Sequence, residues 1–350
     1  MQYIKATDRN FFKYCGVWQT CDKENPDVMV GSWNAPYFEV VFSGKTLYLH
    51  FQKNIYLDIT LDGKTEKNCM VEGKYTVNAE TCGKHTLRVC NPNRTKRAYF
   101  EGISIPDGET LTAADKKPHY IEFVGDSISD NGNSFSFHIG DRLNWDFAIK
   151  ARSAMALQNG RGGWRRTVSE KFDVFPYVLG MEETFFKTVC PDDFLEYANV
   201  ELLYKEWCNG DFDIDFSKVD YFPDIVFIFL GTNDDLYPWM EPIEHTETFI
   251  KHYVSFVRDI KKVYGENTKI CVLQALTNSG GPPDDTVRFD AIDKAFEALK
   301  ENFGDTVRLI NRKQIISWNI DISDDTTHPS NLGYAQLTDC IAPILKEWYE

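Results

Sequence analysis

Between about residues 37 and 90, hydrophobic and polar residues alternate with a period of two. This period is typical of strands that bury one face. The strand-like runs lie at residues 38–42, 47–51, 55–61, 86–90 and 98–105. Turn residues at Ser43-Gly44-Lys45 and Asp62-Gly63 predict breaks between strands. Many short strands with no helical segment between them predict an all-β domain, a sandwich or jelly roll, over residues 1–108.

The pattern changes after a polar, proline-containing segment at residues 106–118, which is the predicted linker. Short apolar runs that predict buried strands lie at residues 120–124, 225–230, 269–275 and 307–310. Apolar residues recur at helical spacing over residues 249–260, 289–299 and 333–348. Strands that alternate with helices predict an α/β domain over residues 119–350, with a parallel sheet covered on both faces. Residues 160–222 match neither pattern and have the character of a long insertion.

The composition excludes some classes of protein. The chain has 350 residues, of which 43% are hydrophobic, so it can build the cores of about two domains and is not globally disordered. Its formal net charge of −15 repels a polyanion, so nucleic acid is not an expected partner. No apolar run approaches the roughly 20 residues of a membrane helix, so no membrane partner is expected either.

Cysteine usage and the first residues bear on the cellular compartment. The nine cysteines form no Cys-x-x-Cys pair, which favours reduced, mostly buried thiols over a disulfide framework or a zinc site. No cluster of histidine, cysteine and carboxylate has ligand spacing, so no metal or other cofactor is expected. The first residues are polar and lack the apolar core of a signal peptide. We therefore expect a cytoplasmic protein, or a secreted one if a signal peptide has been removed.

Reactive residues follow three predicted strands, at the edge where open α/β sheets bind their ligands. The segments are Gly125-Asp126-Ser127, Gly231-Thr232-Asn233-Asp234 and Asp325-Thr326-Thr327-His328. Ser127 is a candidate nucleophile at the start of a helix, and a histidine is the usual base that activates serine near neutral pH. A carboxylate three residues before His328 can orient the imidazole, and the amide of Asn233 can donate to a developing oxyanion. Each segment alone also fits a helix cap, a turn or a structural histidine, but together and in this order they predict a hydrolase site.

These three segments resemble the conserved blocks of the SGNH (GDSL-type) hydrolase superfamily. The resemblance implies that Ser127 is the nucleophile, His328 the general base and Asp325 its orienting acid. It also implies an oxyanion hole built from the Ser127 N–H, Asn233 and a third N–H. Ser153-Ala154 matches the segment that supplies this third donor, with Ala154 in place of glycine, and Gly160 and Gly162 are the alternatives.

An all-β domain before an SGNH domain is similar to carbohydrate esterase family 2. The resemblance implies a cofactor-independent serine O-acetylesterase of plant polysaccharides such as xylan or glucomannan. Some members of this family orient the histidine through a backbone carbonyl, which is the alternative to Asp325. Trp164, Trp239 and Trp318 lie near predicted loops and are candidates for stacking on a sugar ring, although core packing also explains a tryptophan.

Two other functions fit the same sequence. One is a lipid or thioester hydrolase of the same fold, since a fold does not determine the substrate. The other is a carbohydrate-binding protein whose hydrolase domain is inactive. The first domain has two possible roles as well, glycan capture or packing support for the catalytic domain, and the short linker favours packing support.

Overall fold

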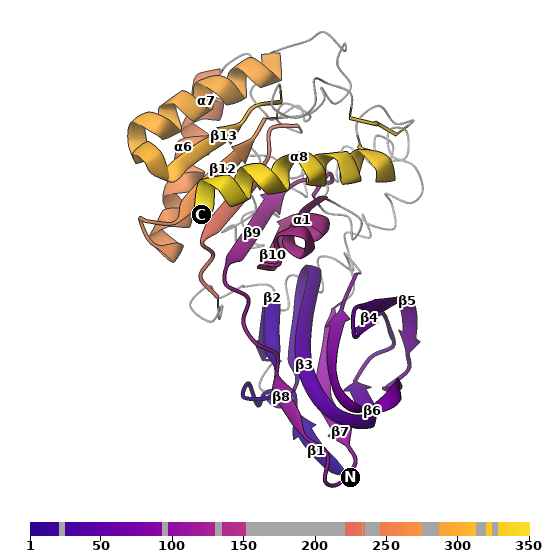
Figure 1. Cartoon of the computed structure of the whole chain (residues 1–350). Helices are drawn as coiled ribbons and strands as arrows, with labels where there is room; N and C mark the ends of the chain where they lie inside the picture. Colours follow the sequence, from indigo (N-terminus) through magenta and orange to yellow (C-terminus); the bar gives the residue numbers. More distant parts are fainter. Residues whose placement is uncertain are drawn as a thin grey trace, which may run out of the picture.

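The structure is a computed structural model of the whole chain (Figure 1). It describes residues 1–20, 25–92, 97–129, 135–151, 221–232, 234, 246–274, 287–312, 320–323 and 328–350. Within these residues, the strands divide into a mainly antiparallel region that precedes residue 114 and a parallel region that follows it.

The antiparallel region is built from eight described strands, drawn in indigo and purple in Figure 1. They are β1 (Gln2–Lys5), β2 (Lys13–Thr20), β3 (Met29–Phe51), β4 (Ile55–Leu61), β5 (Lys64–Val71), β6 (Lys74–Cys90), β7 (Ala98–Ile105) and β8 (Leu111–Ala113). Alternate side chains of β3, among them Phe38, Val40 and Phe42, are buried in one core with Phe100 of β7. The period-two pattern of the sequence therefore identifies the buried face correctly, although β1 and β2 lie before the part that it covered.

One of the two expected turns is a real turn and the other is not. Asp62-Gly63 joins β4 to β5 as a hairpin, and both residues have positive φ, of 48° and 79°. The expected break at Ser43-Gly44-Lys45 is wrong, because β3 continues through it as one strand of 23 residues. Gly44 has a φ of 99°, and the pairing of β3 with β6 shifts register between Gly44 and Thr46. A β-bulge needs a residue in this conformation as much as a turn does, so glycine marks a bulge here.

The parallel region has five described strands in the order β13-β12-β11-β9-β10, and each adjacent pair is parallel. The strands are β9 (Tyr120–Gly125), β10 (Asp146–Ala151), β11 (Ile225–Phe229), β12 (Lys269–Leu273) and β13 (Val307–Ile310). The helices are α1 (Phe135–Leu143), α6 (Thr246–Tyr264), α7 (Val287–Phe303), the short η3 (Gly304–Thr306) and α8 (Asn331–Tyr349). Helices α1 and α8 pack on one face and α6 and α7 on the other, as the sequence predicts (Figure 1).

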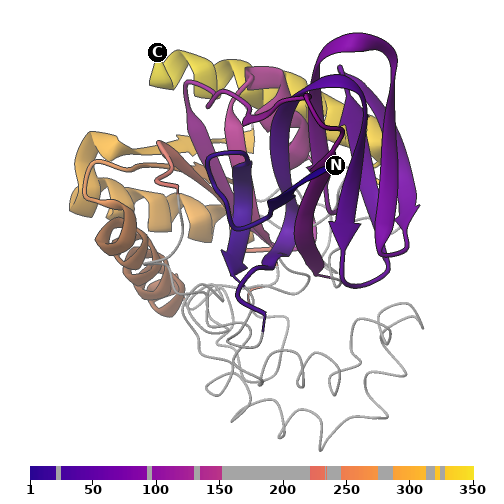
Figure 2. The same ribbon diagram turned by 90° about the horizontal axis from the view of Figure 1, so that it is seen from below.

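The two regions share one continuous sheet, because β10 pairs with β9 on one side and with β3 on the other. The β3–β10 pairing is antiparallel and places Asn34 opposite Ile149. Figure 2 shows the purple strands of the first region beside the magenta strands β9 and β10. Tyr37 and Cys90 of the first region also belong to the core formed by the strands of the second. The regions therefore have a common hydrophobic core at their junction.

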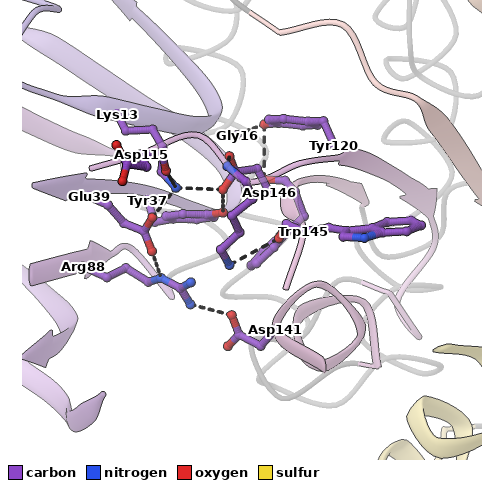
Figure 3. A network of polar contacts seen from close by, with 12 residues as sticks. Lys13, Gly16, Tyr37, Glu39, Arg88, Asp115, Tyr120, Asp141, Trp145 and Asp146 are labelled. Carbon is purple, nitrogen blue, oxygen red and sulfur yellow. Dashed lines mark hydrogen bonds and ion pairs between the residues drawn. The ribbon is translucent and has the colours of Figure 1, made fainter. Parts of the chain in front are cut away.

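Buried charges also cross this junction (Figure 3). Lys13 of β2 forms ion pairs with Glu39 of β3 and with Asp146 of β10, the latter at 2.9 Å. Arg88 of β6 binds Glu39 and Asp141 of α1, both at 2.7 Å. Burial raises the pKa of Glu39, but the charges of Arg88 and Lys13 outweigh it, so the pKa lies below its ordinary value. The carboxylate is therefore held ionised between two cations.

The predicted linker is only partly a connecting segment. Strand β8 lies within it and pairs with β3, with Thr112 opposite Val41. Closer to the second region, the backbone N–H of Lys117 donates to Asp146 at 3.0 Å. The strand pairing and the hydrogen bond tie residues 106–118 to the strands on either side, so little of the segment is free to act as a tether.

Most of the described cysteines are buried, as expected. Those that are buried are Cys15, Cys69, Cys90 and Cys271. Cys340 is partly exposed and Cys82 is exposed, so the expectation is wrong for Cys82. Within the described part of the chain, no helix is long and apolar enough to span a membrane.

Candidate active site

Ser127 lies in a tight turn directly after β9. The backbone N–H of Ile128 donates to the Asp126 carboxylate and that of Ser129 to the Asp126 carbonyl, both at 3.0 Å. A Cβ on Gly125 would lie 2.7 Å from Cβ of Ser129 and 3.1 Å from the Phe229 carbonyl oxygen, so only glycine fits before this turn. Ser127 itself stays partly exposed. The sequence predicts that it opens a helix, but residues 126–129 form a turn and the described helix α1 begins at Phe135.

His328 is held by a loop that closes on itself before α8. The backbone N–H and the hydroxyl of Ser323 both donate to the His328 carbonyl at 2.8 Å. Next to it, Ile322 and Pro329 form an isolated β-bridge. Ser330 caps α8, since its hydroxyl oxygen accepts from the N–H of Gly333 at 3.2 Å. The backbone at His328 is thus anchored at its carbonyl and at the two residues that follow.

The turn and the loop bring Ser127 and His328 together across 201 positions of sequence. Nε2 of His328 lies 2.7 Å from Oγ of Ser127, which is a hydrogen bond. Both side chains are partly exposed, so a small molecule can reach the serine. A neutral imidazole that accepts this hydrogen bond is placed to remove the hydroxyl proton as the oxygen attacks an electrophile.

The remaining predicted site residues lie outside the described residues. They are Asn233, Asp325, Ala154 with its alternatives Gly160 and Gly162, and the tryptophans Trp164, Trp239 and Trp318. The strand register nevertheless places the ends of the two strands, β10 and β11, that precede Ala154 and Asn233 in the sequence. Phe229 of β11 and Ala151 of β10 lie opposite Gly125 on its two sides. The ends of β10 and β11 therefore lie at the same sheet edge as Ser127.

Asp126 is a site residue that the sequence did not single out. Its side chain is completely buried, and its Oδ2 has no hydrogen-bonding partner among the described residues. Burial raises the pKa of Asp126 to about 7, with a contribution from Asp234, while the N–H of Ile128, the hydroxyl of Thr232 and His328 oppose the shift. Asp234 is buried as well. The only signal for Asp126 in the sequence is its place between Gly125, which ends a predicted strand, and the candidate nucleophile Ser127.

The arrangement of the described groups has the features of nucleophilic catalysis. Among the residues that the structure describes, no three histidine, cysteine or acidic side chains form a group that could hold a metal ion. A serine hydroxyl activated by a histidine attacks carbonyl carbons, above all those of esters and thioesters. The Ser127–His328 contact has the geometry that serine-dependent acyl transfer requires.

Comparison with known proteins relates this fold to a class of hydrolases. No model of a known family matches the sequence, and no curated protein matches it. Solved structures do match, and they show that the chain has the fold of SGNH (GDSL-type) hydrolases. Their identity to this chain lies below 20%, so the likeness is one of fold.

Within this class, the matching structures include carbohydrate esterases of family two. One, from Clostridium thermocellum and in complex with cellohexaose, is 19% identical with a TM-score of 0.66, and the match covers 96% of this chain and 99% of that one. An acetyl xylan esterase from Butyrivibrio proteoclasticus is 15% identical with a TM-score of 0.68, over 100% and 99% of the two chains. A salicylyl-acyltransferase from a tetracycline biosynthetic pathway is 13% identical with a TM-score of 0.63, over 99% and 98%. Both regions of the chain are therefore present in all three proteins.

Proposed function

We propose that this protein is a serine-dependent ester hydrolase that removes acetyl groups from the hydroxyls of a carbohydrate. The observation that carries the proposal is the 2.7 Å contact between His328 Nε2 and Ser127 Oγ, in a fold shared over its whole length with carbohydrate esterases. Serine and histidine in this contact form the minimal apparatus for ester cleavage.

The reaction has two steps. Oγ of Ser127 attacks the acetyl carbonyl while Nε2 of His328 takes the hydroxyl proton, and the tetrahedral intermediate then expels the sugar alkoxide, which leaves with that proton. Water next attacks the acetyl-enzyme and transfers a proton to His328. Collapse of the second intermediate releases acetate and restores the Ser127 hydroxyl.

Three further roles complete the proposed site. The oxyanion donors are the Ser127 N–H, Asn233 and Ala154, with Gly160 and Gly162 as alternatives for the last. His328 is oriented by Asp325 or by a backbone carbonyl. The support for these roles is the match of motif positions and, for the oxyanion donors, the place of Ala151 and Phe229 beside Gly125.

For the substrate, we propose an acetylated plant oligosaccharide or polysaccharide of the xylan or glucomannan type. The cellohexaose complex and the acetyl xylan esterase among the matching structures favour a β-linked glycan. Trp164 and Trp239 are the proposed stacking surfaces for its sugar rings.

For the architecture, we propose that residues 1–108 form a jelly-roll domain and residues 119–350 an SGNH hydrolase domain. The change from mainly antiparallel to parallel pairing between β8 and β9 supports this division. The shared core and the ion pairs at the junction favour packing support as the role of the first domain.

The test is acetate release from acetylated xylan, mannan and chitin oligomers by wild type and Ser127→Ala. The proposal requires release by the wild type, preference for one acetylated glycan and loss in the variant. Faster cleavage of octanoyl than of acetyl nitrophenyl ester would show a lipid hydrolase instead. Acyl transfer to an added alcohol in preference to water would show a transferase, and glycan binding without acetate release would show an inactive binding protein.

A further inference from the structure

Strand β10 ends at the catalytic edge, and a side chain from the other region holds its last residue. Ala151 lies opposite Gly125, two positions before Ser127. The Ala151 carbonyl accepts a hydrogen bond of 2.7 Å from Nδ2 of Asn34, which belongs to β3 and lies 117 positions earlier in the chain. Asn34 is buried, with 4% of its surface exposed. The hydrogen bond is therefore sheltered from water, which strengthens it.

Asn34 lies in an irregular segment of β3, residues 33–36, which we call the corner. Ala35 has a φ of 48°, a left-handed conformation that costs energy for any residue except glycine. In the pairing of β2 with β3, Tyr37 lies opposite Cys15 and Ser32 opposite Val17, so residues 33–36 face Gly16 alone. The corner persists because Ala35 is packed in the core of the parallel region. The strain is thus maintained at the point where β3 presents Asn34 to Ala151.

We propose that Asn34 is a positioning residue of the active site, which fixes the end of β10 relative to the Ser127 turn. The proposal rests on the proposed function. From Ala151 the chain leads within three residues to Ala154, the proposed third oxyanion donor. The carbonyl held by Asn34 belongs to the peptide unit from which that segment departs. A rotation of this unit would displace the oxyanion donor and leave substrate binding largely intact, so the effect falls on kcat.

The other end of β10 provides a matched control. Asp146, the first residue of the strand, also contacts the first region, through Lys13 at 2.9 Å. It is buried as well, with 4% of its surface exposed. Ala151 lies five positions further along the strand, roughly 17 Å away at about 3.3 Å per residue. Asp146→Asn thus disturbs the same junction and the same strand, but far from the catalytic edge.

The test compares Asn34→Ala with Asp146→Asn in the full-length protein, by steady-state hydrolysis of nitrophenyl acetate and by thermal unfolding. Asn34→Ala should lower kcat roughly 10- to 100-fold with little change in KM, the usual cost of a misplacement of about 1 Å. Asp146→Asn should lower Tm at least as much and leave kcat near wild type. A wild-type kcat in Asn34→Ala, or equal losses of kcat in both variants, would overturn the proposal.

A second variant and a second measurement keep the test decisive if Asn34→Ala does not fold or if the wild type shows no activity. Asn34→Leu keeps roughly the size of the side chain and removes its N–H donor without adding a charge, so it replaces Asn34→Ala if that variant does not fold. Hydrogen exchange of peptides over residues 147–151 does not depend on activity, and it should accelerate in Asn34→Ala more than in Asp146→Asn. If the wild type shows no Ser127-dependent hydrolysis, the proposed function fails while the exchange still tests positioning. Equal exchange in the two variants contradicts positioning in either case.

Discussion

The parallel region contains both members of the Ser127–His328 contact, whereas the antiparallel region contributes buried groups to the strand beside them. Each end of β10 receives one such group, Asn34 at Ala151 and Lys13 at Asp146. The parallel strands are held mainly by apolar cores on both faces, while the junction adds ion pairs and an amide hydrogen bond. Apolar packing is tolerant of small shifts, but buried polar contacts require definite partners. The first region therefore adds definite polar partners at both ends of β10, beside the buried Lys150–Glu122 pair within the parallel region.

The largest expected effect is the loss of activity in Ser127→Ala and His328→Ala. Each substitution should reduce kcat by at least about 10³-fold, because the two residues act as one unit, and the double variant should be hardly worse than either single one. Both variants should melt within a few degrees of the wild type, measured by circular dichroism. Activity of Ser127→Ala near the wild-type level would contradict the mechanism.

Loss of the proposed oxyanion donor ranks second. Asn233→Ala should lower kcat by roughly 10²- to 10³-fold and leave KM almost unchanged, because the donor acts mainly on the charge that forms in the transition state. Steady-state kinetics with nitrophenyl acetate separates the two constants. A rise in KM at constant kcat would show that Asn233 binds the substrate instead.

Removal of the first region tests whether the parallel region depends on it. A fragment of residues 119–350 loses the β3 partner of β10 and exposes the junction core, so it should be poorly soluble or much less stable than the full chain. The intact protein should melt in a single cooperative transition by calorimetry. A soluble, fully active fragment, with the first region separately binding polysaccharide, would identify that region as an appended binding module.

A smaller stability effect is expected from Lys13→Met. This substitution leaves Glu39 and Asp146 buried with one cation fewer, so it should lower the free energy of unfolding by about 3–5 kcal/mol. Urea denaturation measures the change. Lys64→Met breaks the exposed Lys64–Glu80 pair of the same region and should change stability little. Equal effects of the two variants would show that the buried pairs do not hold the junction.

The smallest expected effect concerns Asp126, in the parallel region. Burial raises its pKa from 3.8 to about 7, so between about pH 4 and 7 the folded protein keeps a proton that the unfolded chain releases. The free energy of unfolding should therefore decrease as pH rises through this window. Asp126→Asn cannot ionise and should flatten the dependence, measured by urea denaturation from pH 5 to 8. The exposed Asp107→Asn is the control, and a slope unchanged in Asp126→Asn would contradict the shifted pKa.

The sequence predicts the parallel region best where strands are buried on both faces. Strands β11 and β13 were found because such burial produces continuous apolar runs. Strand β10 was not found, because the buried Asp146 and Lys150 interrupt its apolar run. Their charges are tolerated only because Lys13 and Glu122 lie beside them in the fold, at 2.9 Å and 2.7 Å. Because Lys13 and Glu122 are distant from β10 in the sequence, no local pattern around this strand reveals them.

For the candidate site, the sequence predicts the pair Ser127 and His328 but not what surrounds it. Ser127 and His328 were chosen from their places after predicted strands, and the structure brings them into contact. The burial of Asp126 and the approach of Asn34 to Ala151 depend on tertiary packing between distant segments. A single sequence carries no signal for either.

The most direct test of the central claim is detection of the acetyl-enzyme. The full-length protein is mixed with an acetylated xylo-oligosaccharide, quenched in acid within milliseconds, digested and analysed by mass spectrometry. We predict a peptide heavier by one acetyl group, about 42 Da, with the modification on Ser127, that accumulates during turnover and disappears when substrate is exhausted. Acetate release without any acetyl-serine, or an acetyl group that is carried by another residue during turnover, would contradict the account.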